Sequence, residues 1–315
     1  MVNNRAIFLG TPEFAVPALQ RLFENSYEIC GIFTQPDRRS GRGQKLQPSP
    51  IKLFAQAHGI PVYQPEKIRL EESRRVFEDI RPDFIVVVAY GQILPGWLLH
   101  SARIAPVNIH ASLLPRYRGA APIAWAIING DTVTGITTMI MEEKLDSGPM
   151  LMQQEVPISI TMTEGELARE LSKTGADLLI RTLEAYQANS VRPVAQDESK
   201  ATWAPRITKA MAQVSWEKPA LELHNHIRGL NPWPVAYCNF RGERLQIWRS
   251  LPETRLLDSA DAPGTFLGIS QEAVKVQCGG GTILRLLEVQ MPARSHVSGR
   301  EFASGARLRT GELIG

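Results

Sequence analysis

The sequence has few cysteines, no long apolar run and almost no net charge. Its three cysteines among 315 residues, Cys30, Cys238 and Cys278, form no CxxC pair. A sparse, odd set argues against a disulfide-stapled fold or a structural zinc site and is typical of a reducing compartment. We therefore expect a cytoplasmic protein.

Apolar runs are short throughout the chain. The longest, Phe84–Tyr90, has seven residues, whereas a helix needs about 20 to span a bilayer. Near the N-terminus, Arg5 precedes a brief apolar stretch, Ala6–Leu9, and then Gly10-Thr-Pro, so the core of a signal peptide is missing. The sequence predicts neither a membrane-spanning segment nor a membrane partner.

Several motifs of nucleotide and metal chemistry are also absent. The sequence contains no GxGxxG, no Walker A sequence, no HExxH and no cluster of cysteines and histidines. Gly10-Thr-Pro follows an apolar stretch where a dinucleotide site could begin, but it lacks the glycines that let a pyrophosphate approach the backbone. We expect neither a nicotinamide or flavin site nor a catalytic metal.

The net charge of +3 is too small to predict a nucleic-acid-binding protein by itself. Residues 1–206 include 22 basic and 22 acidic residues, whereas residues 207–315 include 13 basic and 10 acidic ones. The whole excess therefore lies in the last third of the chain, where it is a first, weak hint of an anionic partner.

The first two hundred residues alternate between strand and helix patterns. The clearest strand is Asp83–Ala89, whose continuous β-branched run is typical of a parallel strand buried on both faces. Such alternation predicts right-handed crossovers and a doubly wound, mostly parallel, Rossmann-like α/β sheet. The further strands expected are 6–9, 27–34, 61–63, 107–110 and 136–141, and the helices are 51–58, 68–80, 120–129 and 163–188.

The pattern changes after residue 189. Residues 190–206 are polar and contain proline, as in a linker. We therefore divide the chain into a first domain, 1–189, a linker, 190–206, and a second domain, 207–315. The second domain is predicted to be a small OB-like β-barrel, because after one helix, 220–228, it has short strands at 236–240, 244–249, 264–270, 273–278 and 282–290.

A Pro- and Gly-rich stretch, Gln35–Pro50, interrupts the first domain. Its basic residues, among them Arg38, Arg42 and Lys45, oppose a single acidic residue, Asp37. Loops of this length in compact domains are usually functional or disordered. We expect a long, mobile, basic loop, which is either a solvated charged segment or a surface for an anionic partner.

Two polar residues stand at the end of a predicted strand. Asn108 and His110 are two apart in the strand 107–110, so their side chains point to the same face. An amide donor beside an imidazole can hold a developing oxyanion and move a proton, and open α/β sheets bind ligands at the carboxyl ends of their strands. The alternative is that His110 is a core histidine and Asn108 caps the strand.

Asp146 follows another predicted strand and precedes Gly148, which places it in a turn. A carboxylate there could orient His110 or accept the proton of an amine nucleophile. The alternative is an aspartate that makes an Asx turn, a common arrangement before glycine. The functional interpretation depends on the two strand ends converging.

A set of motifs runs through the chain. Asn108-Ile-His110 is followed by Ser112-Leu-Leu-Pro115 and later by Leu145-Asp-Ser-Gly148. Further characteristic segments are Phe33–Arg38, Gly41–Gly43, Val88–Pro95, Arg116–Pro122 and Asn231–Pro234. With these motifs nearly the whole chain resembles the 10-formyltetrahydrofolate-dependent formyltransferases. One departure is Lys144, where the family pattern has glycine, and it puts the geometry of that loop in question.

The resemblance implies a reaction and a set of roles. The co-substrate would be 10-formyltetrahydrofolate, and no metal would be needed because N10 of the folate is an adequate leaving group once protonated. Asn108 and His110 would stabilise the oxygen of a tetrahedral intermediate, while Asp146 would fix the imidazole and help to remove the amine proton. The folate site would be lined by Ser112, Leu113, Leu114 and Pro115 and by the backbone of Ile93, Leu94 and Pro95.

The resemblance also implies the acceptor of the formyl group. The segment Thr34-Gln-Pro-Asp37 and the basic second domain favour the α-amino group of methionyl initiator tRNA, whose formylation serves translation initiation. Residues 207–315 would bind this tRNA, and Arg38, Arg42 and Lys45 would contact phosphates of its acceptor stem. We expect the enzyme to be a monomer.

Two other functions remain open at this point. A formyltransferase could act on a small amine, such as a glycinamide ribonucleotide or an amino-sugar nucleotide, but such a substrate needs neither the basic loop nor the second domain. A non-catalytic RNA-binding protein on an α/β scaffold would leave the set Asn108, His110 and Asp146 unexplained. Formyl transfer to methionyl-tRNA, with small amines as controls, separates the three.

Overall fold

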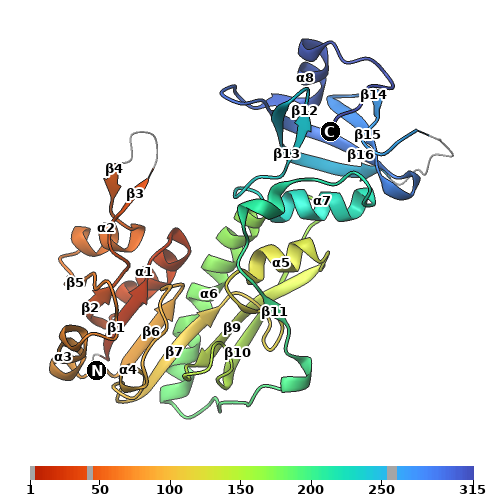
Figure 1. The fold of residues 1–315 in the computed structure, drawn as a ribbon. Helices are drawn as coiled ribbons and strands as arrows, with labels where there is room; N and C mark the ends of the chain where they lie inside the picture. Colours follow the sequence, from red (N-terminus) through yellow and green to blue (C-terminus); the bar gives the residue numbers. More distant parts are fainter. Residues whose placement is uncertain (1–3, 41–44, 254–260) are drawn as a thin grey trace. The chain divides into compact units, whose positions relative to one another are not determined.

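Seven strands form one sheet in the N-terminal half of the chain (Figure 1). The computed structural model describes residues 4–40, 45–253 and 261–315. The strand order in the sheet is β10-β9-β7-β6-β1-β2-β5. These strands are β1 (Arg5–Gly10), β2 (Glu28–Phe33), β5 (Val62–Tyr63), β6 (Phe84–Val88), β7 (Ala105–His110), β9 (Val133–Ile140) and β10 (Met150–Pro157).

The sheet is mostly parallel, which confirms the predicted Rossmann-like architecture. β1 pairs in parallel with β2 and β6, β6 with β7, and β2 with β5, whereas β7 and β9 are antiparallel. All five residues of β6 are buried, as its apolar run indicates for a central strand covered on both faces. The edge strand β10 was not predicted, because residues 153–155 are exposed and polar.

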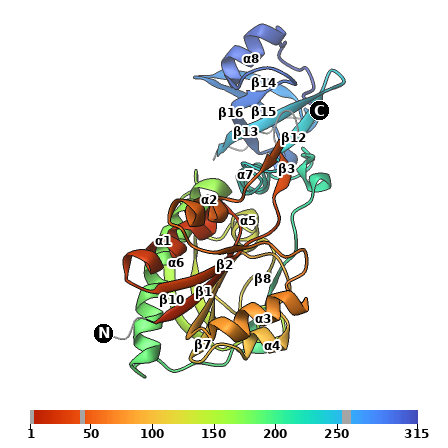
Figure 2. The same ribbon diagram turned by 90° about the vertical axis from the view of Figure 1, so that its left-hand side faces the viewer.

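Helices cover both faces of this sheet (Figure 2). On one face α6 packs beside α1: Ser172 Oγ donates to the carbonyl of Phe14 at 2.7 Å, and Arg21 pairs with Asp177 at 2.8 Å. On the other face, odd-numbered side chains of β1 and β6 share an apolar cluster with α3 and α4. The helices are α1 (Val16–Glu24), α2 (Pro50–Ala57), α3 (Glu71–Ile80), α4 (Gly96–Leu99) and α6 (Glu164–Gln187).

The stretch predicted to be a long loop, residues 35–50, instead contains a β-hairpin in its described part. β3 (Arg38–Ser40) and β4 (Lys45–Gln47) are antiparallel, with Arg38 opposite Gln47 and Ser40 opposite Lys45. The loop prediction was wrong there, because a short strand of charged and polar residues carries no hydrophobic alternation that could reveal it. Arg42 lies outside the described residues.

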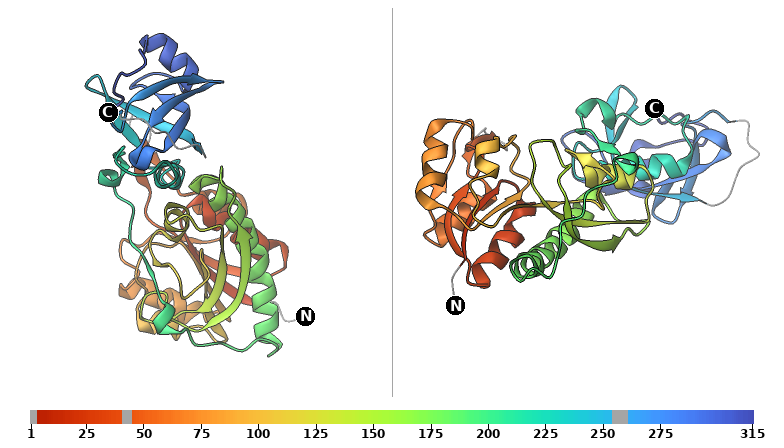
Figure 3. Two further views of the ribbon diagram at one scale, coloured as in Figure 1. Left: turned by 90° about the vertical axis from the view of Figure 1, so that its right-hand side faces the viewer. Right: turned by 90° about the horizontal axis from the view of Figure 1, so that it is seen from below.

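The C-terminal residues form an antiparallel sheet with strand order β12-β13-β16-β15-β14, and β17 pairs with β16. Figure 3 shows this part, at the blue end of its colour bar, from two further sides. Its apolar core includes Leu223 and Ile227 of α7 and Phe302 of α8. The elements are α7 (Ala220–Gly229), β12 (Tyr237–Phe240), β13 (Glu243–Glu253), β14 (Phe266–Ser270), β15 (Ala273–Gln277), β16 (Ile283–Gln290), β17 (Val297–Ser298) and α8 (Gly299–Ala306).

The predicted series of short strands in the last third is confirmed, and these strands pair in an antiparallel sheet. Among the described residues no pairing joins β12 to β14, so closure into an OB-like barrel stays a prediction. Helix α8 was not predicted, although Ser298 and Glu301 form a capping box at its start. Short elements complete the fold: β8 (Arg118–Gly119), β11 (Trp203–Ala204) and the 3₁₀ turns Glu13–Ala15, Glu198–Lys200, Lys209–Ala212 and Gly279–Gly281.

The chain divides into two compact units that are not separated at one point of the sequence. One unit runs up to Gly119 and also contains residues 134–156 and 168–203. The other contains residues 120–133, 157–167 and 204–315. Thus α5 (Pro122–Ile128) clusters with C-terminal residues, since Ala124 shares an apolar cluster with Ile207 and Leu230.

Candidate active site

Polar side chains converge at the carboxyl end of β7. Parallel pairing places Val88 of β6 opposite Gly10 of β1, and Asn108 of β7 opposite Val87, so the three strands end at the same edge of the sheet. Asn108 and His110 are two residues apart on β7 and therefore point to the same face. Both are buried, with 8% and 6% of their surface exposed.

One ring nitrogen of His110 is held by the backbone. Nε2 lies 2.9 Å from the carbonyl oxygen of Tyr117. Since a carbonyl oxygen can only accept, Nε2 carries the proton and Nδ1 of the neutral ring is the free basic nitrogen. Nδ1 faces Oδ1 of Asp146 at 3.7 Å. His110 is thus oriented as a proton acceptor with a carboxylate beside it.

The side chain of Asn108 is buried but unpaired. Among the described residues its carboxamide has no hydrogen-bond partner, and its polar atoms keep some contact with solvent. Both hydrogens of the amide are therefore available to an acceptor that enters the site. An incoming oxygen atom that accepts from its NH₂ group would restore the missing hydrogen bond.

Asp146 lies in the turn after β9, as expected, and its carboxylate is held on one side by the backbone. Oδ2 accepts from the N–H of Gly119 at 2.8 Å, which leaves Oδ1 facing His110. Gly148 is required in this turn because an added Cβ would collide with the carbonyl of Ile140. The expected convergence of the two strand ends was wrong, because β7 and β9 are antiparallel and Ile140, the last residue of β9, pairs with Val107. The loop after β9 brings the Asp146 carboxylate to His110 instead.

Lys144, which departs from the family pattern, points to a carboxylate instead of disturbing the turn. Its Nζ pairs with Oε2 of Glu198 at 3.3 Å. Hydrogen bonds from Arg118 and then from Lys144 lower the pKa of Glu198 to about 2. The lysine therefore adds an ion pair at the outer side of the turn.

The segment after β7 is held by Thr137 of β9. Thr137 Oγ1 donates to the carbonyl of Ser112 at 2.7 Å and accepts from the N–H of Leu114 at 3.0 Å. Ser112 Oγ donates to the carbonyl of Arg116 at 2.6 Å. Ser112 and Leu114 are buried, while Leu113 and Pro115 are partly exposed. The segment is rigidly placed, and its folate role stays a prediction.

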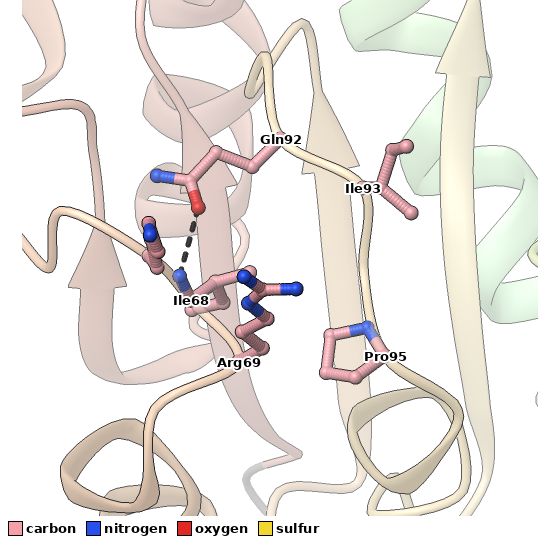
Figure 4. Close-up of a pocket in the computed structure, with 6 residues that line it drawn as sticks. Ile68, Arg69, Gln92, Ile93 and Pro95 are labelled. Carbon is pink, nitrogen blue, oxygen red and sulfur yellow. Dashed lines mark hydrogen bonds between the residues drawn. The ribbon is translucent and has the colours of Figure 1, made fainter.

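A pocket of about 410 Å³ lies beside the loop that follows β6 (Figure 4). Arg69 and Pro95 stand on opposite sides of it, and Gln92 Oε1 accepts from the N–H of Ile68 at 2.8 Å. Ile93 is 86% exposed at this pocket, whereas Leu94 is buried in the core of the sheet. The lining residues are Lys67, Ile68, Arg69, Gln92, Ile93 and Pro95.

Two of the three residues predicted to line the folate site through the 93–95 loop therefore border a pocket, and Leu94 does not. Four lining residues, Lys67 to Arg69 and Gln92, were not predicted. Lys67 and Arg69, on either side of Ile68, were the available sign of a ligand pocket in the sequence. Their proximity to residues 93–95, however, is produced by the fold and cannot be read from the sequence.

Two of the three residues predicted to contact tRNA lie on the described strands of the hairpin. Arg38 is on β3 and Lys45 on β4, and both are exposed. Arg38 Nη2 lies 3.5 Å from Oε1 of Gln35. Arg42, between the two strands, belongs to the part of the chain that is not described. The described strands of the hairpin thus present Arg38 and Lys45 to solvent, beside the exposed Arg39.

The described residues contain neither a metal-binding cluster nor a membrane-spanning helix. No group of three or more His, Cys, Asp or Glu side chains in residues 4–40, 45–253 and 261–315 could bind a metal ion. Within these ranges, no helix has the length and apolar character that crossing a membrane requires.

Solved structures share the fold at low sequence identity. A sugar 3N-formyl transferase, WlaRD, solved with dTDP and 5-N-formyl-THF, has a TM-score of 0.68 and 18% identity, over 94% of this chain and all of that chain. HypX from Aquifex aeolicus, in complex with tetrahydrofolic acid, has a TM-score of 0.61 and 17% identity, over 96% of this chain and 47% of that one. These matches show the fold alone.

Sequence relatives are much closer. The family model "Formyl transferase" matches residues 4–183, and "Formyl transferase, C-terminal domain" matches residues 206–307. The chain is 47% identical to the methionyl-tRNA formyltransferase of Clostridium novyi, over 98% of this chain and 99% of the relative. It is 45% identical to that of Bacillus subtilis, over 99% of this chain and 98% of the relative. The chain therefore belongs to the methionyl-tRNA formyltransferase family.

Proposed function

We propose that the protein transfers the formyl group of 10-formyltetrahydrofolate to the α-amino group of methionyl initiator tRNA. The products are N-formylmethionyl-tRNA and tetrahydrofolate. The observation that carries this proposal is the convergence of Asn108, His110 and Asp146 at one strand end, in a chain whose full length matches relatives of that name. An RNA-binding protein without catalysis would have no use for this set.

The reaction begins when the amine nitrogen attacks the formyl carbon of the folate. A tetrahedral intermediate forms, and the former carbonyl oxygen becomes negatively charged. The unpaired carboxamide of Asn108 donates a hydrogen bond to this oxygen. Because the amide is already buried and fixed on β7, little reorganisation is needed when the charge develops.

The amine must also lose a proton as the new C–N bond forms. Nδ1 of His110 accepts this proton, since Nε2 already donates to Tyr117. The imidazolium that results lies beside the Asp146 carboxylate, which stabilises it, and it adds a second donor near the oxyanion. Proton transfer to N10 then lets the C–N10 bond break, and tetrahydrofolate leaves.

The pocket fits a folate in size and chemistry. Its volume of about 410 Å³ lies within the range of small-molecule sites. Ile68, Ile93 and Pro95 offer apolar surface to aromatic rings, and Lys67 and Arg69 offer positive charge to the glutamate carboxylates. We assign Ser112–Pro115 to the lining of the folate site and the backbone of residues 93–95 to the pterin edge, as predicted from the sequence.

We assign tRNA binding to the basic hairpin and to the C-terminal part of the chain. Arg38 and Lys45 are exposed on β3 and β4, and Arg42 lies between them in the sequence. Residues 207–315 hold the whole net positive charge of the chain. Phosphate contacts from these residues would give affinity and orientation without reading bases.

Finer features of the proposal follow from the same assignment. The catalytic part corresponds to the predicted domain 1–189, and the predicted barrel, 207–315, binds the tRNA as a closed OB-like fold. The enzyme acts as a monomer in the cytoplasm, where initiator tRNA is charged and used.

The decisive experiment measures formyl transfer by the purified protein from 10-formyltetrahydrofolate to methionyl-tRNA. Parallel reactions contain free methionine, an amino-sugar nucleotide or glycinamide ribonucleotide. We expect product only with the charged tRNA. Formylation of a small amine at a comparable kcat/KM would show that tRNA is not the specific substrate. If no amine were formylated, the proposed formyltransferase activity would be refuted.

A further inference from the structure

A glutamine far along the chain forms two hydrogen bonds with the turn that carries Asp146. Gln196 lies in the segment predicted to be a linker, 50 residues after Asp146. Its Nε2 donates to the carbonyl oxygens of Asp146 and of Gly148, both at 2.8 Å. Both hydrogens of the amide are therefore used on the backbone of a single turn.

The orientation of Gln196 is itself determined by a buried cation. Arg118 has no exposed surface, and its Nε and Nη2 donate to Oε1 of Gln196 at 3.0 and 2.7 Å. A flipped amide would direct NH₂ at the guanidinium and oxygen at two carbonyls, so this orientation is the favourable one. Arg118 thus fixes which end of Gln196 faces the turn.

Other guanidinium hydrogens of Arg118 connect it to Glu198, and through Glu198 to the turn. Arg118 donates from Nη1 and Nη2 to the two oxygens of Glu198, at 3.1 and 2.7 Å. Glu198 pairs with Lys144, which precedes Leu145 and Asp146. The turn is consequently held at Lys144, at the Asp146 carbonyl and at the Gly148 carbonyl.

The backbone at Asp146 needs such support. Its φ is +49°, in the left-handed region that glycine adopts freely and that Asp adopts only at some steric cost. A strained backbone of this kind persists only where the surroundings hold it. The gap of 3.7 Å between Oδ1 of Asp146 and Nδ1 of His110 depends directly on that backbone.

We propose that Gln196 is a positioning residue for formyl transfer, which holds the Asp146 carboxylate beside His110, and that Arg118 fixes the orientation of Gln196. This inference rests on the proposed function, because it presupposes that Asp146 acts in the chemical step. Gln196 touches neither His110 nor the predicted folate residues through any hydrogen bond of the described chain. Its influence on the reaction passes through the turn.

The test uses the full-length protein and five variants. Gln196→Glu keeps an acceptor for Arg118 but places a carboxylate against two carbonyl oxygens, and Gln196→Met removes all the hydrogen bonds. Asp146→Asn and the double variant Asp146→Asn/Gln196→Glu show whether Gln196 acts through Asp146. Gln154→Glu, an exposed glutamine on β10, is the matched control for the added charge. Thermal unfolding confirms that each variant is folded.

We expect both Gln196 variants to lower kcat by about 10-fold to 100-fold, the usual effect of a catalytic group displaced by roughly 1 Å. The KM values for the folate and for methionyl-tRNA should stay near those of the wild type. In the Asp146→Asn background, Gln196→Glu should change kcat by less than about 2-fold, because coupled residues are not additive. Gln154→Glu should behave as the wild type.

Two results would overturn the inference. A folded Gln196→Glu protein with normal kcat would show that the hydrogen bonds from Gln196 to the turn are dispensable for catalysis. An equal loss in the wild-type and Asp146→Asn backgrounds would show that Gln196 acts independently of Asp146. If Gln196→Met does not fold, Gln196→Glu decides, since it retains the acceptor for Arg118. Normal kcat in Asp146→Asn would instead refute the role of Asp146 in the proposed function.

Discussion

Nδ1 of His110 faces Oδ1 of Asp146 at 3.7 Å, while Nε2 of the same ring lies 2.9 Å from a backbone carbonyl. The distance is slightly longer than a hydrogen bond. The imidazole can therefore accept a proton at Nδ1 and, once charged, is attracted by the carboxylate. This relationship makes the pair suitable for deprotonating an amine.

The first prediction concerns the chemical step. His110→Ala and Asn108→Ala should each lower kcat by about 10²–10³-fold, the usual cost of losing an oxyanion donor. The KM for the folate should change little, because neither side chain belongs to the pocket near Ile93. Steady-state kinetics with methionyl-tRNA measure both constants. His100→Ala, at an exposed histidine, is the control. Near-normal turnover in a folded variant would exclude that residue from the mechanism.

The second prediction concerns the folate pocket. Arg69→Ala should raise the KM for 10-formyltetrahydrofolate by about 10-fold, the loss of one charge-assisted contact. Ile93→Asp should also raise it, since a carboxylate would replace apolar surface at the pocket. The kcat at saturating folate should stay unchanged. Arg74→Ala, at an exposed helix position paired with Glu78, is the control for loss of a charge. Unchanged KM values in Arg69→Ala and Ile93→Asp would place the folate elsewhere.

The third prediction concerns the hairpin. Arg38→Ala, Arg42→Ala and Lys45→Ala should each raise the KM for methionyl-tRNA and leave the KM for the folate unchanged. Each lost phosphate contact should also reduce the slope of log affinity against log salt by roughly 0.7–0.9. Binding of methionyl-tRNA across a salt series measures the slope. Lys173→Ala on α6 removes an exposed cation away from the hairpin and should leave both quantities as in the wild type. If the KM values and salt slopes of all three hairpin variants equal those of Lys173→Ala, the hairpin is only a solvated charged segment.

The fourth prediction is a pH dependence of stability. Glu166 accepts from the backbone N–H of Thr163 at 2.9 Å and pairs with Arg249 at 2.6 Å, and these contacts lower its pKa from 4.5 to about 2. Because the folded pKa lies below the unfolded one, the stabilisation is complete above about pH 4.5 and is lost as the pH falls toward 2.

Glu166→Gln should therefore lower the free energy of unfolding at pH 7, by about 1 kcal/mol as for a lost helix cap. The difference from the wild type should shrink as the pH falls below 4.5. Urea denaturation at several pH values measures it. Glu170→Gln, exposed on the same helix, is the control. A difference that does not vary with pH would contradict the ionic origin of the stabilisation.

The fifth prediction concerns a chain that ends at Arg206. Such a chain keeps α5 but loses Ile207 and Leu230, which share its apolar cluster. Exposing this cluster should lower the melting temperature, because buried apolar contacts are lost. Thermal unfolding followed by circular dichroism measures the change. An unchanged melting temperature would show that residues 207–315 are dispensable for the fold, and tRNA binding by the truncated protein could then be measured directly.

Local spacing was enough to predict much of the fold. The apolar run of β6 determined a central strand, since such a run must be buried on both faces. The two-residue spacing of Asn108 and His110 placed both on one face of β7, because side chains alternate along a strand. The hairpin of residues 38–47 escaped this reasoning, as its pairing depends on backbone hydrogen bonds between residues without an apolar pattern.

The tertiary structure decided which distant residues meet. Asp146 lies 36 residues after His110 and reaches it because β9 is next to β7 in the sheet. The local sequence pattern does not reveal that these two strands are neighbours. Gln196 and Arg118 are 78 residues apart and meet under the Asp146 turn, although the sequence indicated a linker around Gln196. Periodicity reports which face a side chain occupies, whereas strand order and loop packing are set by burial across the whole chain. The chemical groups of the site were therefore visible in the sequence, and their orientation was determined by the fold.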